Sequence, residues 1–307
     1  MGKIAFVFAG QGAQYVGMGK KLYDEFQCCR DVFNKADEAI GFKISDLCFN
    51  GSKEELDKTE NTQPAILTVS VAALKALEEK GIKPDVVAGL SLGEYSAHVC
   101  SGTFDFETAV RLVKKRGKYM QEAVPEGVGA MAAVIGLDKE IIKEAIEPLN
   151  EIGTIEIANY NCPGQIVIAG EVKAVEKAAE ALREKGARKV IMLAVSGPFH
   201  TSMLKPAAEK LEQELKNIEI NDMSIPLVTN ISGSYVKSKT DVKDILKRQV
   251  MSSVLWEDSI RTMIKDGVDT FIEVGPGKTL TTFIRKIDRS VKVFNVEDVD
   301  SLNKCEF

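Results

Sequence analysis

The sequence predicts an α/β protein in which a large unit built on a parallel sheet carries a smaller inserted unit. Three observations support this prediction. Short apolar strands alternate with helices towards both ends of the chain. About seventy residues in the middle follow the order β-α-β-β-α-β. A G-x-S-x-G pentapeptide stands where a strand should meet a helix.

The first part of the chain alternates strand and helix from its start. The apolar run at residues 4–9 is too short for a signal peptide and leads into a Gly-rich loop, so it is typical of a first strand. Pro64 stands in the first turn of a predicted helix, where proline is tolerated. The predicted elements are strands at 3–9 and 86–88 and helices at 31–40, 63–80 and 105–124.

The order of predicted strands and helices changes near Glu126. Pro163-Gly164 supplies the turn of a central hairpin. The predicted elements are strands at 129–135, 155–160, 165–170 and 187–193 and helices at 139–147 and 171–185. This order is the ferredoxin-like arrangement, so we expect a small ferredoxin-like domain over residues 127–196.

Alternating helices and strands return after Gly197-Pro198. The predicted elements are helices at 204–216, 241–250, 253–266 and 279–287 and strands at 225–230 and 270–274. We therefore expect residues 1–126 and 197–307 to form one large domain, with a parallel sheet covered by helices.

Composition limits the classes of function. The chain has 307 residues, of which 45% are hydrophobic and 28% charged, which is typical of a soluble globular protein. Its net charge of −5 provides no strong basic field, so we expect no nucleic-acid partner. No segment reaches the ~18 apolar residues that cross a membrane, so we expect no membrane partner.

The cysteines indicate a reducing compartment. There are 6 of them, few for this length, and none forms a C-x-x-C pair. We expect reduced thiols in a cytoplasmic protein that has no metal site.

Gly89-Leu90-Ser91-Leu92-Gly93 has the form of a nucleophile elbow. A sharp turn with serine at its apex crowds neighbouring chains, and residues without a Cβ relieve that crowding. The turn lifts the hydroxyl clear of the sheet and leaves free N–H groups at the helix start, where a developing oxyanion can be held. Ser91 is thus the candidate nucleophile of a hydrolase-like large domain, although so short a pattern also occurs by chance.

A nucleophilic serine needs a base, and the chain has only 2 histidines. His98 follows Ser91 by two turns of the same predicted helix, ~10 Å along its axis, so it is predicted to be a structural histidine with satisfied hydrogen bonds. His200 follows the last strand of the small domain, at a domain junction where clefts form. It is the candidate base; the alternative is an ordinary loop histidine.

Arg116 lies on the inward face of a predicted helix. It continues the apolar stripe of that helix, three residues after Val113. A buried charge is costly unless it is paired. Two interpretations follow: an internal salt bridge, or capture of a substrate carboxylate.

The loop Gly10-Gln11-Gly12-Ala13-Gln14 follows the first predicted strand. It is not a G-x-G-x-x-G motif, so a nucleotide site is not predicted. Either it is only a tight turn, or it brings a backbone N–H or the Gln11 amide beside the elbow.

Several motifs in a fixed order resemble the malonyl-CoA:acyl-carrier-protein transacylases of fatty acid synthesis and the related acyltransferase domains of polyketide synthases. The resemblance runs almost end to end. It is carried by residues 8–14, 61–65, 89–97, 116–121, 197–200 and 273–278.

The resemblance implies a two-step transfer of a malonyl group from malonyl-CoA to the phosphopantetheine thiol of a holo acyl carrier protein. Ser91 would be the acylated nucleophile, His200 its base, and Arg116 the grip on the malonyl carboxylate. The coenzyme A thioester is the substrate, and no cofactor is implied.

Further roles come from the same resemblance. The backbone N–H groups of Gln11 and Leu92 would form the oxyanion hole. Gln249 matches the position whose backbone carbonyl orients the base, in place of an acidic third member. Asn159 and Asn161 look like residues that line the cleft from the small domain.

Three positions bear on selectivity. Many members have His where this chain has Leu90 and Pro where it has Ala9. Loss of that His, which is not the base, should alter the polarity of the pocket rather than abolish the chemistry. Phe199 before the base resembles malonyl-selective members, because methylmalonyl-selective ones usually carry a smaller residue there.

Other functions stay open at this point. A polyketide-associated discrete acyltransferase would share every motif above. A serine thioesterase or esterase would use the same elbow and base with water as acceptor. A catalytically inactive acyl-binding subunit would not need both Ser91 and His200. We expect a monomer.

Overall fold

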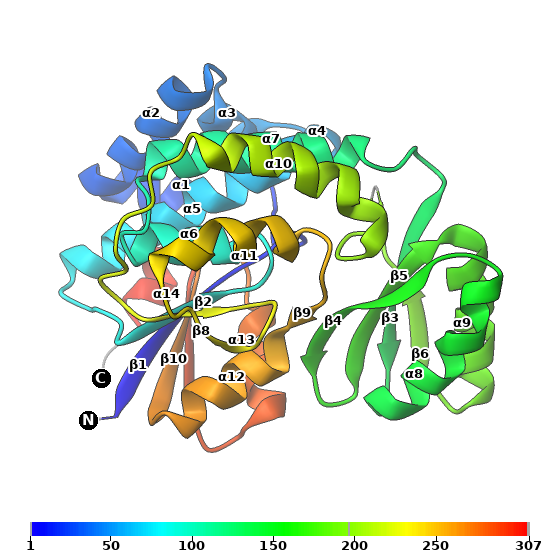
Figure 1. The fold of residues 1–307 in the computed structure, drawn as a ribbon. Coiled ribbons are helices and arrows are strands. Elements are labelled where there is room, and N and C mark those ends of the chain that lie inside the picture. Colours follow the sequence, from blue (N-terminus) through cyan, green and yellow to red (C-terminus); the bar gives the residue numbers. More distant parts are fainter. Residues whose placement is uncertain (1, 196, 306–307) are drawn as a thin grey trace.

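The structure, a computed structural model, describes residues 2–195 and 197–305. Within these residues two β-sheets lie side by side, and helices cover both of them (Figure 1). The larger sheet holds strands from both ends of the chain, as the alternation of strands and helices predicts. The smaller sheet lies to one side and is built mostly from the middle of the sequence.

The large sheet has the strand order β11-β10-β1-β2-β7-β8. Its strands are β1 (Lys3–Phe8), β2 (Val86–Gly89), β7 (Leu227–Thr229), β8 (Ser234–Tyr235), β10 (Val268–Val274) and β11 (Lys292–Val296). All neighbours pair in parallel except β8, which runs antiparallel to β7. The predicted parallel sheet is therefore confirmed.

Helices cover both faces of this sheet, and the central strands are buried on both sides. Phe6 and Phe8 pack into the core on one side of the sheet, and Ala5 and Val7 pack into the core on the other. The helices are α1 (Lys20–Glu25), α2 (Gln27–Ile40), α3 (Ile44–Asn50), α4 (Lys53–Asp57), α5 (Thr59–Glu79), α6 (Gly93–Cys100), α7 (Phe106–Glu122), α10 (Lys205–Lys216), α11 (Val242–Gln249), α12 (Trp256–Lys265), α13 (Thr279–Ile287) and α14 (Val299–Leu302).

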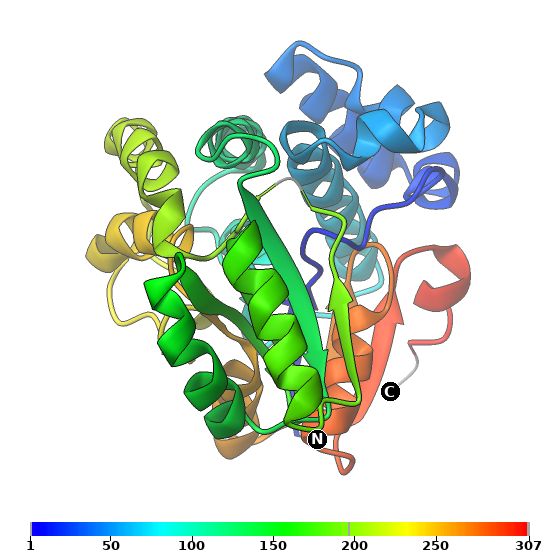
Figure 2. The same ribbon diagram turned by 90° about the vertical axis from the view of Figure 1, so that its right-hand side faces the viewer.

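The small sheet has the order β6-β3-β5-β4-β9. Its strands are β3 (Gly129–Ile135), β4 (Ile155–Cys162), β5 (Gln165–Glu171), β6 (Lys189–Met192) and β9 (Val254–Leu255), and α8 (Lys139–Ile146) and α9 (Val172–Glu184) cover its outer face (Figure 2). The first four strands and these two helices follow the predicted βαββαβ order. The domain boundaries at 126/127 and 196/197 stay a prediction.

Strand β9 joins this small sheet from a later part of the chain. It pairs in parallel with β4, with Asn159 opposite Val254. The sequence predicts one helix over 253–266, which is wrong at its start: β9 comes first, and α12 begins at Trp256. Two residues of strand carry too little periodicity to be recognised without their partner.

Further elements differ from the prediction. Helix α5 begins at Thr59, so Pro64 lies inside the helix rather than in its first turn. The polar start of α5 hides it in the sequence, and the hydroxyl of buried Thr62 donates to the Leu56 carbonyl at 2.5 Å. The edge strand β11 and the short helices near the N-terminus were not predicted.

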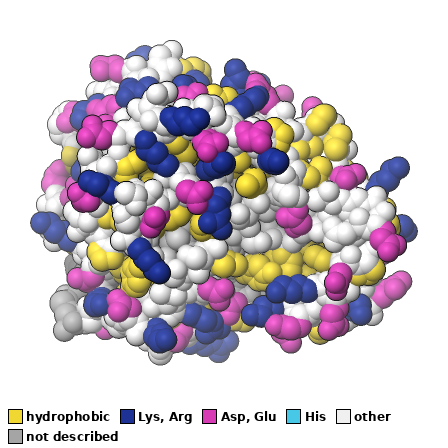
Figure 3. Space-filling view, in the orientation of Figure 1, with side chains coloured by type: hydrophobic (Ala, Val, Ile, Leu, Met, Phe, Trp, Pro, Cys, Tyr) yellow, Lys and Arg dark blue, Asp and Glu magenta, His cyan; other side chains and the backbone are white. Residues whose placement is uncertain are grey.

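Charges of both signs are interspersed over the face shown in Figure 3. Among the described residues, no helix is long and apolar enough to span a membrane. All of the cysteines lie in the described ranges and carry free thiols, and the residues of these ranges contain no cluster suited to hold a metal ion.

Candidate active site

The elbow forms where β2 passes into α6. Ser91 has a φ of 53°, in the left-handed region that a non-glycine residue rarely adopts. A Cβ at Gly89 would lie 1.9 Å from the Gly93 carbonyl carbon, and a Cβ at Gly93 would lie 2.1 Å from the Phe8 carbonyl oxygen. Only glycine fits at either position, so the predicted crowding around the serine is confirmed.

Asn230 holds the strained turn in place. The Ser91 N–H donates to Asn230 Oδ1 at 2.6 Å, and Asn230 Nδ2 donates to the Gly89 carbonyl at 2.7 Å. Sequence reasoning gave Asn230 no role. Its position directly after β7, at the same sheet edge as the elbow, was the available signal.

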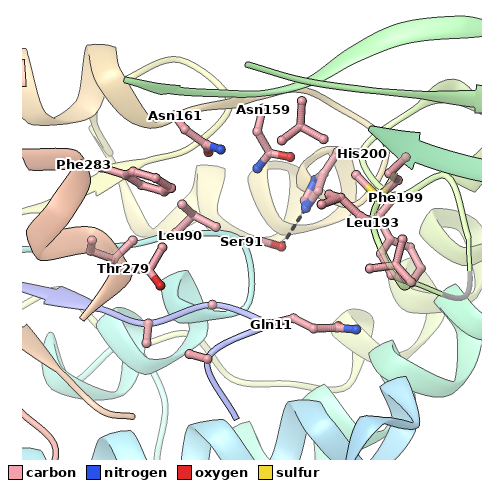
Figure 4. A pocket seen from close by; sticks show the side chains of 18 of the residues that line it. Gln11, Leu90, Ser91, Asn159, Asn161, Leu193, Phe199, His200, Thr279 and Phe283 are labelled. Carbon is pink, nitrogen blue, oxygen red and sulfur yellow. Dashed lines mark hydrogen bonds between the residues drawn. The ribbon is translucent and has the colours of Figure 1, made fainter. Parts of the chain in front are cut away.

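Ser91 and His200 meet inside the molecule (Figure 4). Ser91 Oγ lies 2.6 Å from His200 Nε2. His200 Nδ1 faces two carbonyl oxygens, that of Gln249 at 2.9 Å and that of Ser252 at 3.2 Å. Carbonyl oxygens only accept, so Nδ1 carries the hydrogen, and the lone pair on Nε2 can accept the Ser91 hydroxyl proton.

The surroundings of His200 keep its imidazole neutral. Its pKa is lowered to about 4, chiefly by burial, and the positive charge of Arg116 acts in the same direction. The backbone carbonyls of Gln249 and Ser252 act in the opposite direction, but they do not outweigh burial. At neutral pH the group is therefore a free base.

His98 does not reach Ser91. It is fully buried in α6, stacks on Phe104 and contacts Thr103 Oγ1 through Nδ1 at 3.2 Å. Its Nε2 has no hydrogen-bond partner among the described residues, so the prediction that its hydrogen bonds are satisfied is wrong for this nitrogen. Burial lowers its pKa to about 3.

Arg116 is buried behind Ser91, with 1% of its surface exposed. Its guanidinium donates to Gln63 Oε1 at 2.9 Å, to Gln249 Oε1 at 3.0 Å and to Ser91 Oγ at 3.3 Å. It also lies over the Tyr95 ring, 5.2 Å from the ring centre. None of the carboxylates in the described ranges forms an ion pair with it, so the internal salt bridge considered from the sequence does not form as a direct contact.

The loop after β1 passes directly against the elbow. A Cβ at Gly10 would lie 2.5 Å from the Leu90 carbonyl oxygen. The side-chain amide of Gln11 donates to Thr59 Oγ1 at 3.3 Å, away from the elbow. The backbone N–H groups of Gln11 and Leu92 make no hydrogen bond to another residue that the structure describes.

A cavity of about 240 Å³ lies over Ser91 between the two sheets. In Figure 4, Leu90, Asn161, Thr279 and Phe283 stand on one side of Ser91, and Leu193, Phe199 and His200 on the other. Of the sequence-predicted site residues, those that line the cavity are Gln11, Ser91, Asn159, Asn161, Phe199 and His200. Leu92, Arg116 and Gln249 are buried and do not line it.

Asn161 leaves a polar atom without a partner at this cavity. The residue is 6% exposed, and its Oδ1 accepts no hydrogen bond from any residue of the described ranges. A buried amide oxygen without a donor is costly, and a ligand N–H would satisfy it.

Comparison with known proteins agrees with this geometry. Residues 5–304 match the acyl transferase domain family. The chain is 48% identical over 303 residues to the malonyl CoA-acyl carrier protein transacylase of Bacillus subtilis, covering 98% of this chain and 96% of that protein.

Solved structures show the same relationship. The malonyl CoA-acyl carrier protein transacylase of Clostridium perfringens superposes with a TM-score of 0.96 at 52% identity, covering 98% of this chain and 95% of that one. A malonyl-transacylase in complex with a type II polyketide-synthase acyl-carrier protein has a TM-score of 0.96 at 42% identity, covering 98% of both chains. The chain therefore belongs to the acyl transferase family, among the malonyl CoA-acyl carrier protein transacylases.

Proposed function

We propose that this protein transfers the malonyl group of malonyl-CoA to the phosphopantetheine thiol of an acyl carrier protein. One observation carries the choice of acyl group. The buried Arg116 guanidinium has only neutral hydrogen-bond acceptors and lies 3.3 Å from Ser91 Oγ. A malonyl group on Ser91 keeps a free carboxylate, which would give this cation the anionic partner that it lacks.

In the first half-reaction, Ser91 Oγ attacks the thioester carbonyl carbon while its proton passes to His200 Nε2. The oxyanion is held by the backbone N–H groups of Leu92 and Gln11, which have no other acceptor among the described residues. The intermediate then expels the coenzyme A thiolate, which takes the proton from His200. A malonyl ester on Ser91 remains.

The second half-reaction is the reverse of the first with another thiol. His200 takes the proton of the phosphopantetheine thiol, the thiolate attacks the ester, and Ser91 Oγ leaves and regains its proton. The two carbonyls that hold His200 Nδ1 keep the same tautomer through both halves. An acidic third member is not needed for this orientation.

Binding of the malonyl carboxylate changes the contacts of Arg116. The carboxylate must displace the guanidinium contact to Ser91 Oγ, which is the longest of its three hydrogen bonds at 3.3 Å. Gln63 and Gln249 still hold the other N–H groups. Phe199 would pack against the acyl group, and the free Asn161 Oδ1 would accept an amide N–H of the pantetheine arm.

We also propose that the protein acts without a cofactor, as a monomer, in the cytoplasm. Every group used in the two steps belongs to one chain, and none of the steps needs redox or Lewis-acid chemistry. Free thiols at every cysteine fit a reducing compartment. That the protein acts in fatty acid synthesis rather than in polyketide synthesis stays a prediction.

Arg116→Ala tests the choice of acyl group. We expect kcat/KM for malonyl-CoA to fall about a hundredfold, because truncation leaves the malonyl carboxylate without its buried partner. The low turnover of acetyl-CoA, which has no distal carboxylate, should change much less. Lys115→Ala is the matched control, since Lys115 is the neighbouring cation on α7 and pairs with Glu214 at the surface. Equal losses for both substrates would make Arg116 purely structural.

The acceptor is tested separately with radiolabelled malonyl-CoA. Label should move to holo carrier protein, and little free malonate should form when the carrier protein is left out. Release of malonate at the rate of transfer would contradict the proposal and identify a hydrolase.

A further inference from the structure

The two steps above do not use Glu94, a buried carboxylate beside the site. Glu94 lies three residues after Ser91, in the first turn of α6, and none of its surface is exposed. A buried carboxylate is costly unless donors surround it. Its contacts therefore indicate what it holds in place.

Glu94 accepts hydrogen bonds on both oxygens. The Thr229 hydroxyl donates to Oε1 at 2.7 Å. The Asn230 backbone N–H and Gln249 Nε2 both donate to Oε2 at 3.0 Å. One carboxylate thus joins the strand end that supports the elbow to the helix end that supports the base.

The contact to Gln249 fixes the orientation of its amide. Nε2 donates to Glu94 Oε2 and to the Ser91 carbonyl, at 2.8 Å for the latter, so Oε1 must face Arg116. A flipped amide would place its NH₂ against the guanidinium and its oxygen against the carboxylate. Both of these contacts are repulsive, so Glu94, together with the Ser91 carbonyl, keeps Gln249 Oε1 facing Arg116.

The same arrangement keeps the two charges close but apart. The Gln249 amide lies between the Glu94 carboxylate and the Arg116 guanidinium. A direct ion pair would occupy the guanidinium and compete with a substrate carboxylate. The intervening amide leaves the cation balanced at longer range, oriented, and able to exchange its contact with Ser91 Oγ.

We propose that Glu94 is a positioning residue that acts through Gln249 on Arg116 and so sets the preference for acyl groups that carry a carboxylate. This inference rests on the proposed function. Glu94 touches neither substrate nor reacting atoms. Its effect should therefore appear in the ratio of malonyl to acetyl turnover and not only in overall activity.

Glu94→Gln tests the proposal, because it keeps the shape and replaces one oxygen by a donor. We expect the ratio of kcat/KM for malonyl-CoA to that for acetyl-CoA to fall between about tenfold and a hundredfold, because the neutral amide no longer balances the buried charge of Arg116 through Gln249. Thr229→Val is the matched control. It removes the other side-chain contact of Glu94 and leaves the link to Gln249, so the ratio should stay as in the wild type.

A double-variant comparison separates positioning from general damage. In an Arg116→Ala background, Glu94→Gln should cause no further change in the ratio, because the residue on which it acts is gone. A full additional fall of the ratio in the Arg116→Ala background would overturn the inference. So would an equal loss of kcat/KM for both substrates in Glu94→Gln alone. If Arg116→Ala alone leaves the ratio unchanged, the proposed carboxylate grip fails and the inference fails with it.

A second variant covers the case in which Glu94→Gln does not fold. Gln249→Leu breaks the same link from the other side and keeps the backbone carbonyl that accepts from His200. It should lower the malonyl to acetyl ratio to a similar extent. An unchanged ratio in a folded Gln249→Leu protein would overturn the inference.

Discussion

His200 is buried beside the positive charge of Arg116, and both conditions disfavour its protonated form. A base with a pKa of about 4 is unprotonated over the whole neutral range. Its weak intrinsic basicity is offset by the 2.6 Å contact to the serine and by the oxyanion donors, which stabilise the charge that forms on attack.

The pH dependence of acylation follows from this pKa. Since the base form persists until pH falls towards 4, the rate of acylation by malonyl-CoA should stay flat from neutral pH into the mildly acidic range and decline only below it. Rapid-quench measurement of the first turnover gives this profile. A decline centred near the ordinary histidine value of ~6.5 would contradict the assignment.

Arg116→Ala should shift the acidic side of the pH–rate profile to higher pH. Removing a nearby positive charge raises the pKa of His200, so acetyl transfer by the variant should decline at higher pH than acetyl transfer by the wild-type protein. The comparison uses acetyl-CoA because malonyl turnover is itself expected to fall. An acidic side that does not move would mean that the two charges are not coupled.

At the scale of single residues, the sequence motifs revealed the catalytic and substrate-binding residues but not the residues that hold them in place. Ser91, His200 and Arg116 each follow from a local pattern. The support given by Asn230 to the Ser91 N–H joins residues 139 positions apart, and no local pattern encodes such a contact. Gln63 and Glu94 lie within the quoted motifs, yet their roles depend on partners contributed by α7 and α11.

At the scale of elements, the elbow depends on close approach between β1, β2 and α6. Gly93→Ala should cost ~3 kcal/mol or more of unfolding free energy, because its Cβ would meet the Phe8 carbonyl, and backbone cannot move aside. Gly81→Ala is the comparison. It has a φ of 76° but nothing within 4 Å of a Cβ, so it should cost only about 1–2 kcal/mol. Equal losses in urea unfolding would contradict the crowding argument.

Helix α6 also carries a pH-dependent contribution to stability through His98. The unfolded chain binds a proton near pH 6.5, whereas the folded state resists it until about pH 3. The contribution of neutral His98 to the free energy of unfolding is therefore fully present above pH 6.5. It is lost as pH is lowered through this window, by about 1.4 kcal/mol per pH unit. The position near the helix C-terminus favours a charged histidine, but burial outweighs it.

His98→Asn isolates this contribution, because asparagine keeps a hydrogen-bonding group and does not titrate. Between about pH 6 and pH 5, the unfolding free energy of the variant should fall less than that of the wild-type protein. The difference should approach the slope of one titrating proton, about 1.4 kcal/mol per pH unit. Urea unfolding at both pH values measures the difference. Parallel losses in the two proteins would show that His98 is protonated in the folded state.

Long, periodic elements were predicted well, and short or edge elements were not. Strand β3 and helix α13 match their predicted bounds because each has a clear buried face. Strand β9 is defined by its pairing with β4, and β11 is an edge strand with an irregular burial pattern. Their existence depends on neighbours that are distant in sequence.

At the scale of the whole molecule, the candidate site lies where the two sheets meet. Ser91 comes from the large sheet, His200 from the chain that returns from the small one, and Gln249 from the end of α11 just before β9. Strand β9 pairs with β4, and Ser253 Oγ donates to the Ile157 carbonyl at 2.5 Å. These contacts tie the carbonyls that hold His200 to the sheet that carries Asn159 and Asn161.

Intact-mass analysis after brief incubation with malonyl-CoA tests the central claim most directly. The account predicts a mass increase of one malonyl group, located on Ser91 by peptide mapping, removed by holo carrier protein and absent from Ser91→Ala. An unmodified wild-type protein, or the same adduct on the Ser91→Ala variant, would contradict the account.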